Sequence, residues 1–355
     1  MSQFLANHMK TMKPYTPGHQ PKKGEYIKLN TNENPFPPPP EVSEIMSESA
    51  KSLHLYSDTN CKLLTDTFAE HYQISPESVI FANGSDEILA FCYMAFCDSD
   101  KGMCFPSISY GFYPVYADLF NIDGKKIPLN PDLTISPDHY FNQDHHIVIA
   151  NPNAPTGIAL TLSQIEEILV HNPKNVVIID EAYVHFGGES AMKLTETYQN
   201  LIVCGTFSKS RNLAGGRLGY AVAHPSLLAD LNLVKFSFNP YNVNTLTQAL
   251  GVASIKNDRY FQHCTQSVVK TRRYFIDSFD KLGFHTLPSC ANFIFTKHHD
   301  RDGAFLFEKL KEHKILVRHF DQEPINQYLR ITIGTQEEMA VVVQKMTQIL
   351  EENHA

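Results

Sequence analysis

The chain has 355 residues, of which 43% are hydrophobic and 19% charged, and this ordinary usage excludes a disordered chain and a membrane bundle. At roughly 100 to 200 residues per domain, this length favours two domains. The formal net charge of -8 is unfavourable for binding a phosphate backbone, so we expect small-molecule substrates and no nucleic acid.

The seven cysteines are odd in number and form no CxxC pair, which is typical of a reduced, intracellular protein. The opening MSQFLANHMK lacks the pattern of a signal peptide, and no apolar stretch is long enough to span a membrane. We therefore expect a cytoplasmic protein with no membrane contact. The 17 histidines show no ligand spacing such as HExxH, and we expect no metal.

The first 40 residues are rich in proline and end in NPFPPPP, which forms neither a helix nor a central strand. We expect an arm over residues 1–40 that lies on another surface. From about residue 60, the runs SVIFA, KGMCF, HHIVIA, NVVIID, LIVCGT and LGYAVA alternate with helical patterns, which predicts a mostly parallel sheet flanked by helices. One helix is expected from Asp86 and another from Ser163, where Ser163 and Glu166 match a capping box.

The pattern changes after about residue 240 to longer helical stretches, followed by the strand-like runs CANFIFT, KILVRHF and YLRITIG. This succession predicts a smaller α+β domain. We therefore divide the chain into the arm at 1–40, a large α/β domain at 41–240 and a small C-terminal domain at 241–355.

Residues suited to ligand binding follow the predicted strands, where open α/β sheets place their ligands. Asn83-Gly84-Ser85-Asp86-Glu87 joins SVIFA to a helix, and free N–H groups at a helix start can hold a phosphate. The alternative is an ordinary N-cap by Ser85 or Asp86.

Asp180 ends NVVIID, where its carboxylate could hold a protonated ring nitrogen, and Tyr183 could reach a hydroxyl of the same ring. The alternative for Asp180 is an N-cap or an ion pair with a surface arginine.

Lys209 follows the strand LIVCGT and lies among hydroxyls and glycines, where desolvation and a nearby cation would lower its pKa and free the amine for imine formation. Most lysines, however, are solvated surface charges. Arg318 and Arg330 end the apolar runs KILVR and YLR and could grip a carboxylate or a phosphate, although strand-end arginines also form plain salt bridges.

Taken in order, these motifs resemble those of the fold-type I pyridoxal-phosphate aminotransferases, and most closely the histidinol-phosphate aminotransferase family. The matching segments run along nearly the whole chain: PY at Pro14, LNTNENP from Leu29, LYSD around Tyr56, GSDE from Gly84, YGFY from Tyr110, NPNAPTG from Asn151, DEAY from Asp180, SK at Ser208, LAGGRLGY, LPSCANFI, ILVR and YLRITIGT. The resemblance implies an α/β fold with a mostly parallel sheet in the large domain.

By this resemblance, pyridoxal 5'-phosphate is the cofactor, and Lys209 forms the internal aldimine and later moves the proton between Cα and C4'. Asp180 would pair with the pyridine nitrogen, Tyr183 would touch O3', and Tyr110 would stack on the ring. The positions implied around the cofactor phosphate are Ser85, Asp86, Thr206, Ser208 and Arg217, with Tyr56 supplied by the second subunit of a homodimer. The substrate-facing positions are Tyr15, Arg318 and Arg330.

The implied reaction is a ping-pong transfer in histidine biosynthesis. Glutamate would give its amino group to the cofactor and leave as 2-oxoglutarate, and imidazole-acetol phosphate would become histidinol phosphate. Two other activities share these motifs: an aromatic amino-acid aminotransferase, and a threonine-phosphate decarboxylase on the same scaffold.

Three positions depart from the family pattern. Ala154 stands where an asparagine usually bonds O3', so that contact is lost or is replaced by the neighbouring Asn153. Arg211 replaces an aromatic or small residue, and we expect it to add positive charge near the site. Gly216 replaces a larger apolar residue and leaves a gap.

Overall fold

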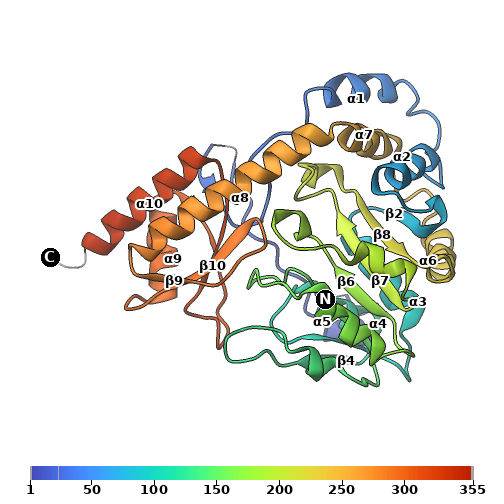
Figure 1. Ribbon diagram of the computed structural model, residues 1–355, viewed down its shortest axis with the longest axis horizontal. Coiled ribbons are helices and arrows are strands. Elements are labelled where there is room, and N and C mark those ends of the chain that lie inside the picture. The colour runs from blue at the N-terminus through green and yellow to red at the C-terminus, as the bar shows by residue number, and fades with distance from the viewer. Residues whose placement is uncertain (1, 23, 353–355) are drawn as a thin grey trace.

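The computed structural model describes residues 2–22 and 24–352. Its α-helices are α1 (Val42–Ala50), α2 (Lys62–Tyr72), α3 (Ser85–Phe96), α4 (Phe112–Phe120), α5 (Leu162–Val170), α6 (Pro225–Phe238), α7 (Thr245–Lys256), α8 (Asp258–Asp280), α9 (Gly303–Glu312) and α10 (Gln336–Glu351). Short 3-10 helices are η1 (Asn7–Lys10), η2 (Pro76–Ser78), η3 (Pro137–Tyr140), η4 (Val184–Phe186), η5 (Ala191–Glu196) and η6 (Ala214–Gly216). Figure 1 shows the helices surrounding the sheets.

The larger sheet has seven strands in the order β2-β8-β7-β6-β5-β3-β4. They are β2 (Val79–Ala82), β3 (Met103–Pro106), β4 (Gly124–Ile127), β5 (His146–Ala150), β6 (Val177–Asp180), β7 (Leu201–Thr206) and β8 (Gly219–Ala223). Only β8 runs antiparallel to its neighbours, while the other pairs are parallel. The predicted mostly parallel sheet is therefore confirmed.

The burial of each strand explains whether it could be predicted from the sequence. Strands β2, β3, β5, β6, β7 and β8 are buried along their whole length, as expected for a sheet covered on both faces, and they are the six apolar runs. Strand β4 was not predicted because it is the edge strand of polar sequence GKKI and is largely exposed.

The start of α5 differs from the prediction. Thr161, with an extended backbone, is the N-cap, and the capping box joins Thr161 to Gln164, so the proposed Ser163–Glu166 box is wrong. Both pairs fit the sequence pattern, but Ser163 already lies inside the helix. Helix α3 begins at Ser85, one residue before the expected Asp86, with Gly84 as its N-cap.

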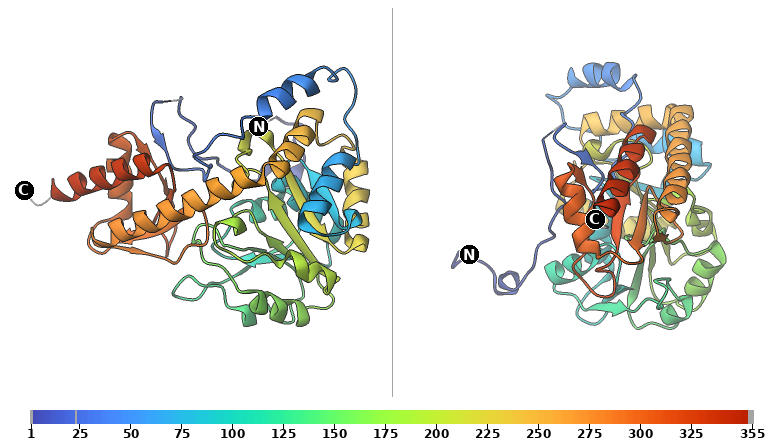
Figure 2. Two further views of the ribbon diagram at one scale, coloured as in Figure 1. Left: turned by 45° about the horizontal axis from the view of Figure 1, so that its top comes forward. Right: turned by 90° about the vertical axis from the view of Figure 1, so that its left-hand side faces the viewer.

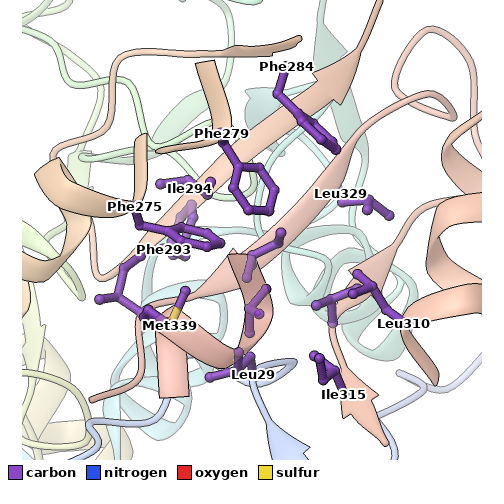
Figure 3. Packing of buried hydrophobic residues seen from close by; sticks show 14 of the residues in the cluster. Leu29, Phe275, Phe279, Phe284, Phe293, Ile294, Leu310, Ile315, Leu329 and Met339 are labelled. Carbon is purple, nitrogen blue, oxygen red and sulfur yellow. The ribbon is translucent and has the colours of Figure 1, made fainter. Parts of the chain in front are cut away.

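The C-terminal part contains an antiparallel sheet in the order β12-β13-β10-β9, made of β9 (Phe284–Thr286), β10 (Phe293–His298), β12 (Arg318–His319) and β13 (Leu329–Thr332). In the arm, β1 (Ile27–Lys28) pairs in parallel with β11 (Ile315–Leu316). The arm's Leu29 and residues of α8, α9 and α10 bury one apolar core with this sheet (Figure 3).

Helix α8 runs from beside α7 to the smaller sheet, and so links the two parts of the molecule (Figure 1). The first residues extend away from the body in the right-hand view of Figure 2. The boundaries at residues 40 and 240 stay predictions. Among the helices in residues 2–22 and 24–352, none is long and apolar enough to cross a membrane.

Candidate active site

Two adjoining cavities, of about 370 and 100 Å³, lie at the carboxyl ends of β5, β6 and β7, and both are lined by Tyr110, Ala154, Tyr183 and Lys209. Parallel neighbours in a sheet end at the same edge, which is why residues far apart in the sequence meet here. The smaller cavity is further lined by Ser85, Asp86, Ala150, Asp180, Ala182, Thr206, Ser208 and Arg217.

One end of the smaller cavity is built to hold an anion. Gly84 has φ +86° and caps α3 without a side-chain acceptor, so the cap leaves the first N–H groups of the helix free for a ligand. The positive φ is what favours glycine at this position; a Cβ there would also lie 2.4 Å from an Arg217 Nη atom, at the flexible end of that side chain. The Thr206 hydroxyl lies 3.0 Å from the Ser208 hydroxyl at the same end.

Asp86 lines the smaller cavity, and its carboxylate is bonded to two side chains of the site. It accepts hydrogen bonds from the Tyr110 hydroxyl at 2.7 Å and from an Arg217 Nη at 3.0 Å. Its negative charge therefore orients these two side chains, while its backbone N–H, at the start of α3, is the group suited to a phosphate.

Asp180 is 4% exposed and sits at the end of β6. One carboxylate oxygen accepts from the Tyr113 hydroxyl at 3.0 Å and the other from the Ala182 N–H at 3.2 Å. Burial raises the pKa of Asp180 to about 6, while the two hydrogen bonds lower it. None of the ion pairs within residues 2–22 and 24–352 involves Asp180, which argues against the surface-arginine alternative.

The Lys209 amine donates to the backbone carbonyl of Thr31 at 3.0 Å. Burial, followed by the positive charge of Arg330, lowers the pKa of Lys209 to about 8. Both causes were anticipated from the sequence, and together they give this lysine an appreciable neutral fraction near neutral pH.

Tyr183 is held from the arm. Its hydroxyl accepts a hydrogen bond from Asn32 Nδ2 at 3.0 Å, and Asn32 is tied in turn to Thr332 of β13 through its N–H and its Oδ1, each at 3.0 Å. Tyr183 therefore sits where the arm, the large sheet and the small sheet meet. The Lys209 amine lies 6.0 Å from the centre of its ring.

The larger cavity brings Tyr15, Arg318 and Arg330 together above Lys209. Arg318 and Arg330 are directly opposite each other on β12 and β13. Arg330 donates from an Nη to the Asn30 carbonyl at 3.0 Å, and its buried Nε has no hydrogen-bond partner among the described residues. In the described part of the chain neither arginine forms an ion pair, and two such arginines side by side favour an anionic ligand.

Tyr56 lies apart from the other predicted residues. It lines neither cavity of its own chain, is 83% exposed and stacks on Tyr241 with ring centres 4.4 Å apart. The remaining predicted positions all line one of the two cavities.

Sequence reasoning missed several residues that shape the site: Thr31, Asn32 and Tyr113, with Asn30 and Lys126 in the larger cavity. Asn32 lies in the LNTNENP motif and Tyr113 in YGFY, so the motifs were the available signal. Nothing local in the sequence pairs them with Tyr183 and Asp180.

The structure gives the surroundings of the three residues that differ from the family pattern, Ala154, Arg211 and Gly216. Ala154 lines both cavities, but Asn153 is not its replacement, because Asn153 lines neither of them. Its side-chain amide donates to the Ile108 carbonyl, and its side-chain oxygen accepts from Ser109. The expectation for Arg211 is also wrong: it is buried away from the cavities, where it bonds the Ser254 carbonyl, Tyr72 and Asp258. At Gly216 a Cβ would meet only ordinary contacts, the nearest at 3.4 Å.

The lining chemistry fits a phosphorylated pyridine aldehyde. Hydroxyls, helix N–H groups and Arg217 suit the phosphate, and Asp180 suits a ring N–H. Lys209 lines the same cavity and has a lowered pKa. The described residues contain no group of three or more His, Cys, Asp or Glu side chains that could hold a metal.

The model of the family described as "Aminotransferase class I and II" matches residues 24–346. The histidinol-phosphate aminotransferase of Brachyspira hyodysenteriae is 48% identical over 352 residues, covering 99% of both chains. That of Acinetobacter baumannii is 45% identical and covers 97% of both. The chain belongs to the histidinol-phosphate aminotransferase family.

Solved structures agree with the fold. The histidinol-phosphate aminotransferase of Sinorhizobium meliloti, in complex with pyridoxal-5'-phosphate, superposes with a TM-score of 0.87 at 18% identity and covers 99% of both chains. The enzyme of Clostridium acetobutylicum gives 0.84 at 20% identity, covering 92% of this chain and 99% of that one. Family membership confirms the predicted α/β transferase fold, the aminotransferase class and pyridoxal 5'-phosphate as the cofactor.

Proposed function

We propose that this member of the family transfers the amino group between histidinol phosphate and 2-oxoglutarate, as a step of histidine biosynthesis. The names of relatives 42–48% identical over nearly the whole chain support this substrate. The observation that carries it is the pair Arg318 and Arg330 above Lys209, because both substrates bring an anionic group that such a pair can bind.

Pyridoxal 5'-phosphate, when bound, supplies an electron-poor ring that stabilises negative charge at the substrate Cα. Lys209 would hold it covalently and, once released, would move the proton from Cα as general base. Asp180 would keep the ring nitrogen protonated, and Tyr183 would donate to the ring oxygen while Asn32 holds its hydroxyl in place. Ser85, Thr206, Ser208 and Arg217, with the N–H groups of α3, would bind the phosphate.

The same guanidinium would serve both halves of a ping-pong reaction. The buried Nε of Arg330 has no partner in the described residues and lies beside its bound Nη, so Arg330 can present two parallel donors to a carboxylate of glutamate or to a phosphate. Tyr15 stacks on Phe112, with ring centres 4.4 Å apart, and would close the cavity over the substrate from the arm.

The chain would work as a homodimer. Large apolar side chains are exposed in the segments that contain Tyr56 and its stacking partner Tyr241, namely Leu53, Leu55, Phe236, Phe238 and Tyr241 itself. Burying them against a second copy would stabilise the pair. Tyr56 would then reach the phosphate of the partner's cofactor. We place this dimer in the cytoplasm, where its seven free cysteines would stay reduced.

The test is a comparison of amino donors with purified enzyme and 2-oxoglutarate. We expect glutamate formation from L-histidinol phosphate at a kcat/KM at least 100-fold above that from L-phenylalanine. A doubly charged phosphate can pair with both Arg318 and Arg330, whereas the single carboxylate charge of phenylalanine would leave one of them without a partner. Faster turnover of phenylalanine would reassign the enzyme to aromatic amino acids. Release of carbon dioxide from threonine phosphate without a keto acid would make it a decarboxylase.

A further inference from the structure

Tyr113 is a fully buried tyrosine of α4 that lines neither cavity, yet its hydroxyl points at a residue of the site. It donates to one oxygen of Asp180 at 3.0 Å, while the Ala182 N–H binds the other oxygen. The carboxylate is thus held from two sides. Each oxygen keeps a lone pair for a further donor.

The surroundings of Asp180 disfavour its ionised form, so a hydrogen bond to the carboxylate is needed to stabilise its charge. Burial raises its pKa to about 6, and the carboxylate of Asp86 adds a smaller push in the same direction. The hydrogen bond from Tyr113 is the largest influence that lowers the pKa. A neutral Asp180 could not pair with a protonated ring nitrogen as an ion.

The hydroxyl of Tyr113 is a dependable donor. Burial, followed by the charge of Asp180, raises its own pKa well above the usual range, so the phenol keeps its proton. Its ring packs edge-on against Tyr110, with centres 5.6 Å apart, and at a tilt against Phe105, with centres 6.0 Å apart. The core therefore fixes the position of the ring.

On the basis of the proposed cofactor chemistry, we propose that Tyr113 is a positioning residue that keeps Asp180 ionised and aimed at the cofactor's ring nitrogen. The alternative is that Tyr113 only fills the core. Among the described residues, no other ionisable group near Asp180 donates a hydrogen bond to its carboxylate. These groups are Asp86 of α3, Tyr116 of α4, Glu181, Tyr183 and Cys204 of β7.

Tyr93 offers a matched control. It is also fully buried, and its hydroxyl donates to the backbone carbonyl of Tyr113 at 3.1 Å rather than to Asp180. Tyr113→Phe and Tyr93→Phe each remove one buried hydroxyl from the same aromatic cluster. Only the first removes a donor from the carboxylate.

The experiment measures the dissociation constant of pyridoxal 5'-phosphate from the stripped enzyme between pH 5.5 and 8.5, by absorbance. Losing a hydrogen bond to a charged group raises the pKa of an acid by roughly one unit. Tyr113→Phe should therefore raise the pKa of Asp180, and with it the acid-side midpoint of cofactor binding, by about one unit. Affinity should then fall roughly fivefold at pH 6 and less than about twofold at pH 8.5. Tyr93→Phe should follow the wild type.

An equal loss of affinity at every pH, or the same curve for both variants, would overturn the role of Tyr113. If Tyr113→Phe fails to fold because the buried charge of Asp180 has then lost a donor, the double variant with Asp180→Asn removes that charge as well, and its pH curve should match that of Asp180→Asn alone. A further change in the double variant would also overturn the proposal. A wild-type protein that binds no pyridoxal 5'-phosphate would instead refute the proposed function.

Discussion

Lys209 owes its low pKa, about 8, to burial first and to the positive charge of Arg330 second. Arg330→Met keeps the bulk but removes the charge, so the pKa of Lys209 should rise by roughly one unit. The rate at which the stripped enzyme takes up pyridoxal 5'-phosphate, measured against pH, would report this as a midpoint shifted upward. Arg318→Met is the control, because Arg318 is not among the main influences on Lys209. Equal shifts in both variants would contradict this explanation.

Covalent attachment of the cofactor should depend on Lys209 alone. Lys209→Ala should abolish transamination, and borohydride reduction should leave no cofactor on the chain. In the wild type, mass spectrometry after reduction should find the cofactor on the peptide that contains Lys209. Turnover retained by the variant would show that another residue does this work.

At the scale of elements, β5 is held partly by a buried histidine. His146 Nδ1 accepts a hydrogen bond from the Val176 N–H at 2.9 Å, and burial lowers the pKa of His146 to about 4. Because the pKa of His146 is lowered in the folded state, its contribution to the free energy of unfolding is complete above pH 6.5 and is lost as the pH falls through 4. The wild type should therefore lose stability in acid.

His146→Asn keeps an acceptor for Val176 but cannot gain the proton. Between pH 7 and 4.5 the free energy of unfolding of the stripped wild type should fall by roughly 2 kcal/mol more than that of the variant. His171→Asn, on the exposed end of α5, serves as the control and should follow the wild type. Parallel curves for wild type and His146→Asn in urea unfolding would rule this effect out.

Strands could be predicted from the sequence where they are buried along their whole length and therefore consist of a continuous run of apolar residues, as in β6 and β7. Strand β4 is polar because it lies at an exposed edge, and β9 has only three residues, so neither left a pattern. The start of α5 was ambiguous because two overlapping capping boxes fit, and only the extended backbone at Thr161 decides between them.

At the scale of the whole molecule, the motifs predicted which residues line the site, but not the hydrogen-bond partners that fix their side chains in place. Lys209 meets Thr31 across 178 positions, and Tyr183 meets Asn32 across 151. Such contacts depend on how the arm crosses the two sheets, which no local pattern records. The misplaced expectation for Arg211 has the same origin, since its partner Asp258 opens α8.

The proposed dimer can be tested by subunit mixing. The native mass should be about twice the 40.2 kDa of one chain. Tyr56→Ala and Lys209→Ala should each be impaired, but after mixing, half of the dimers would hold one site with both residues intact, so roughly a quarter of the wild-type activity should return. Activity that never exceeds the sum of the separate variants would place Tyr56 outside the partner's site.

A single half-reaction decides whether histidinol phosphate is the substrate. L-histidinol phosphate is added to the cofactor-loaded enzyme without a keto acid, and the absorbance band of the bound aldehyde is followed. We predict rapid loss of the band as the cofactor takes the amino group, and no comparable response to L-phenylalanine. A band that persists with histidinol phosphate and disappears with phenylalanine would contradict the account.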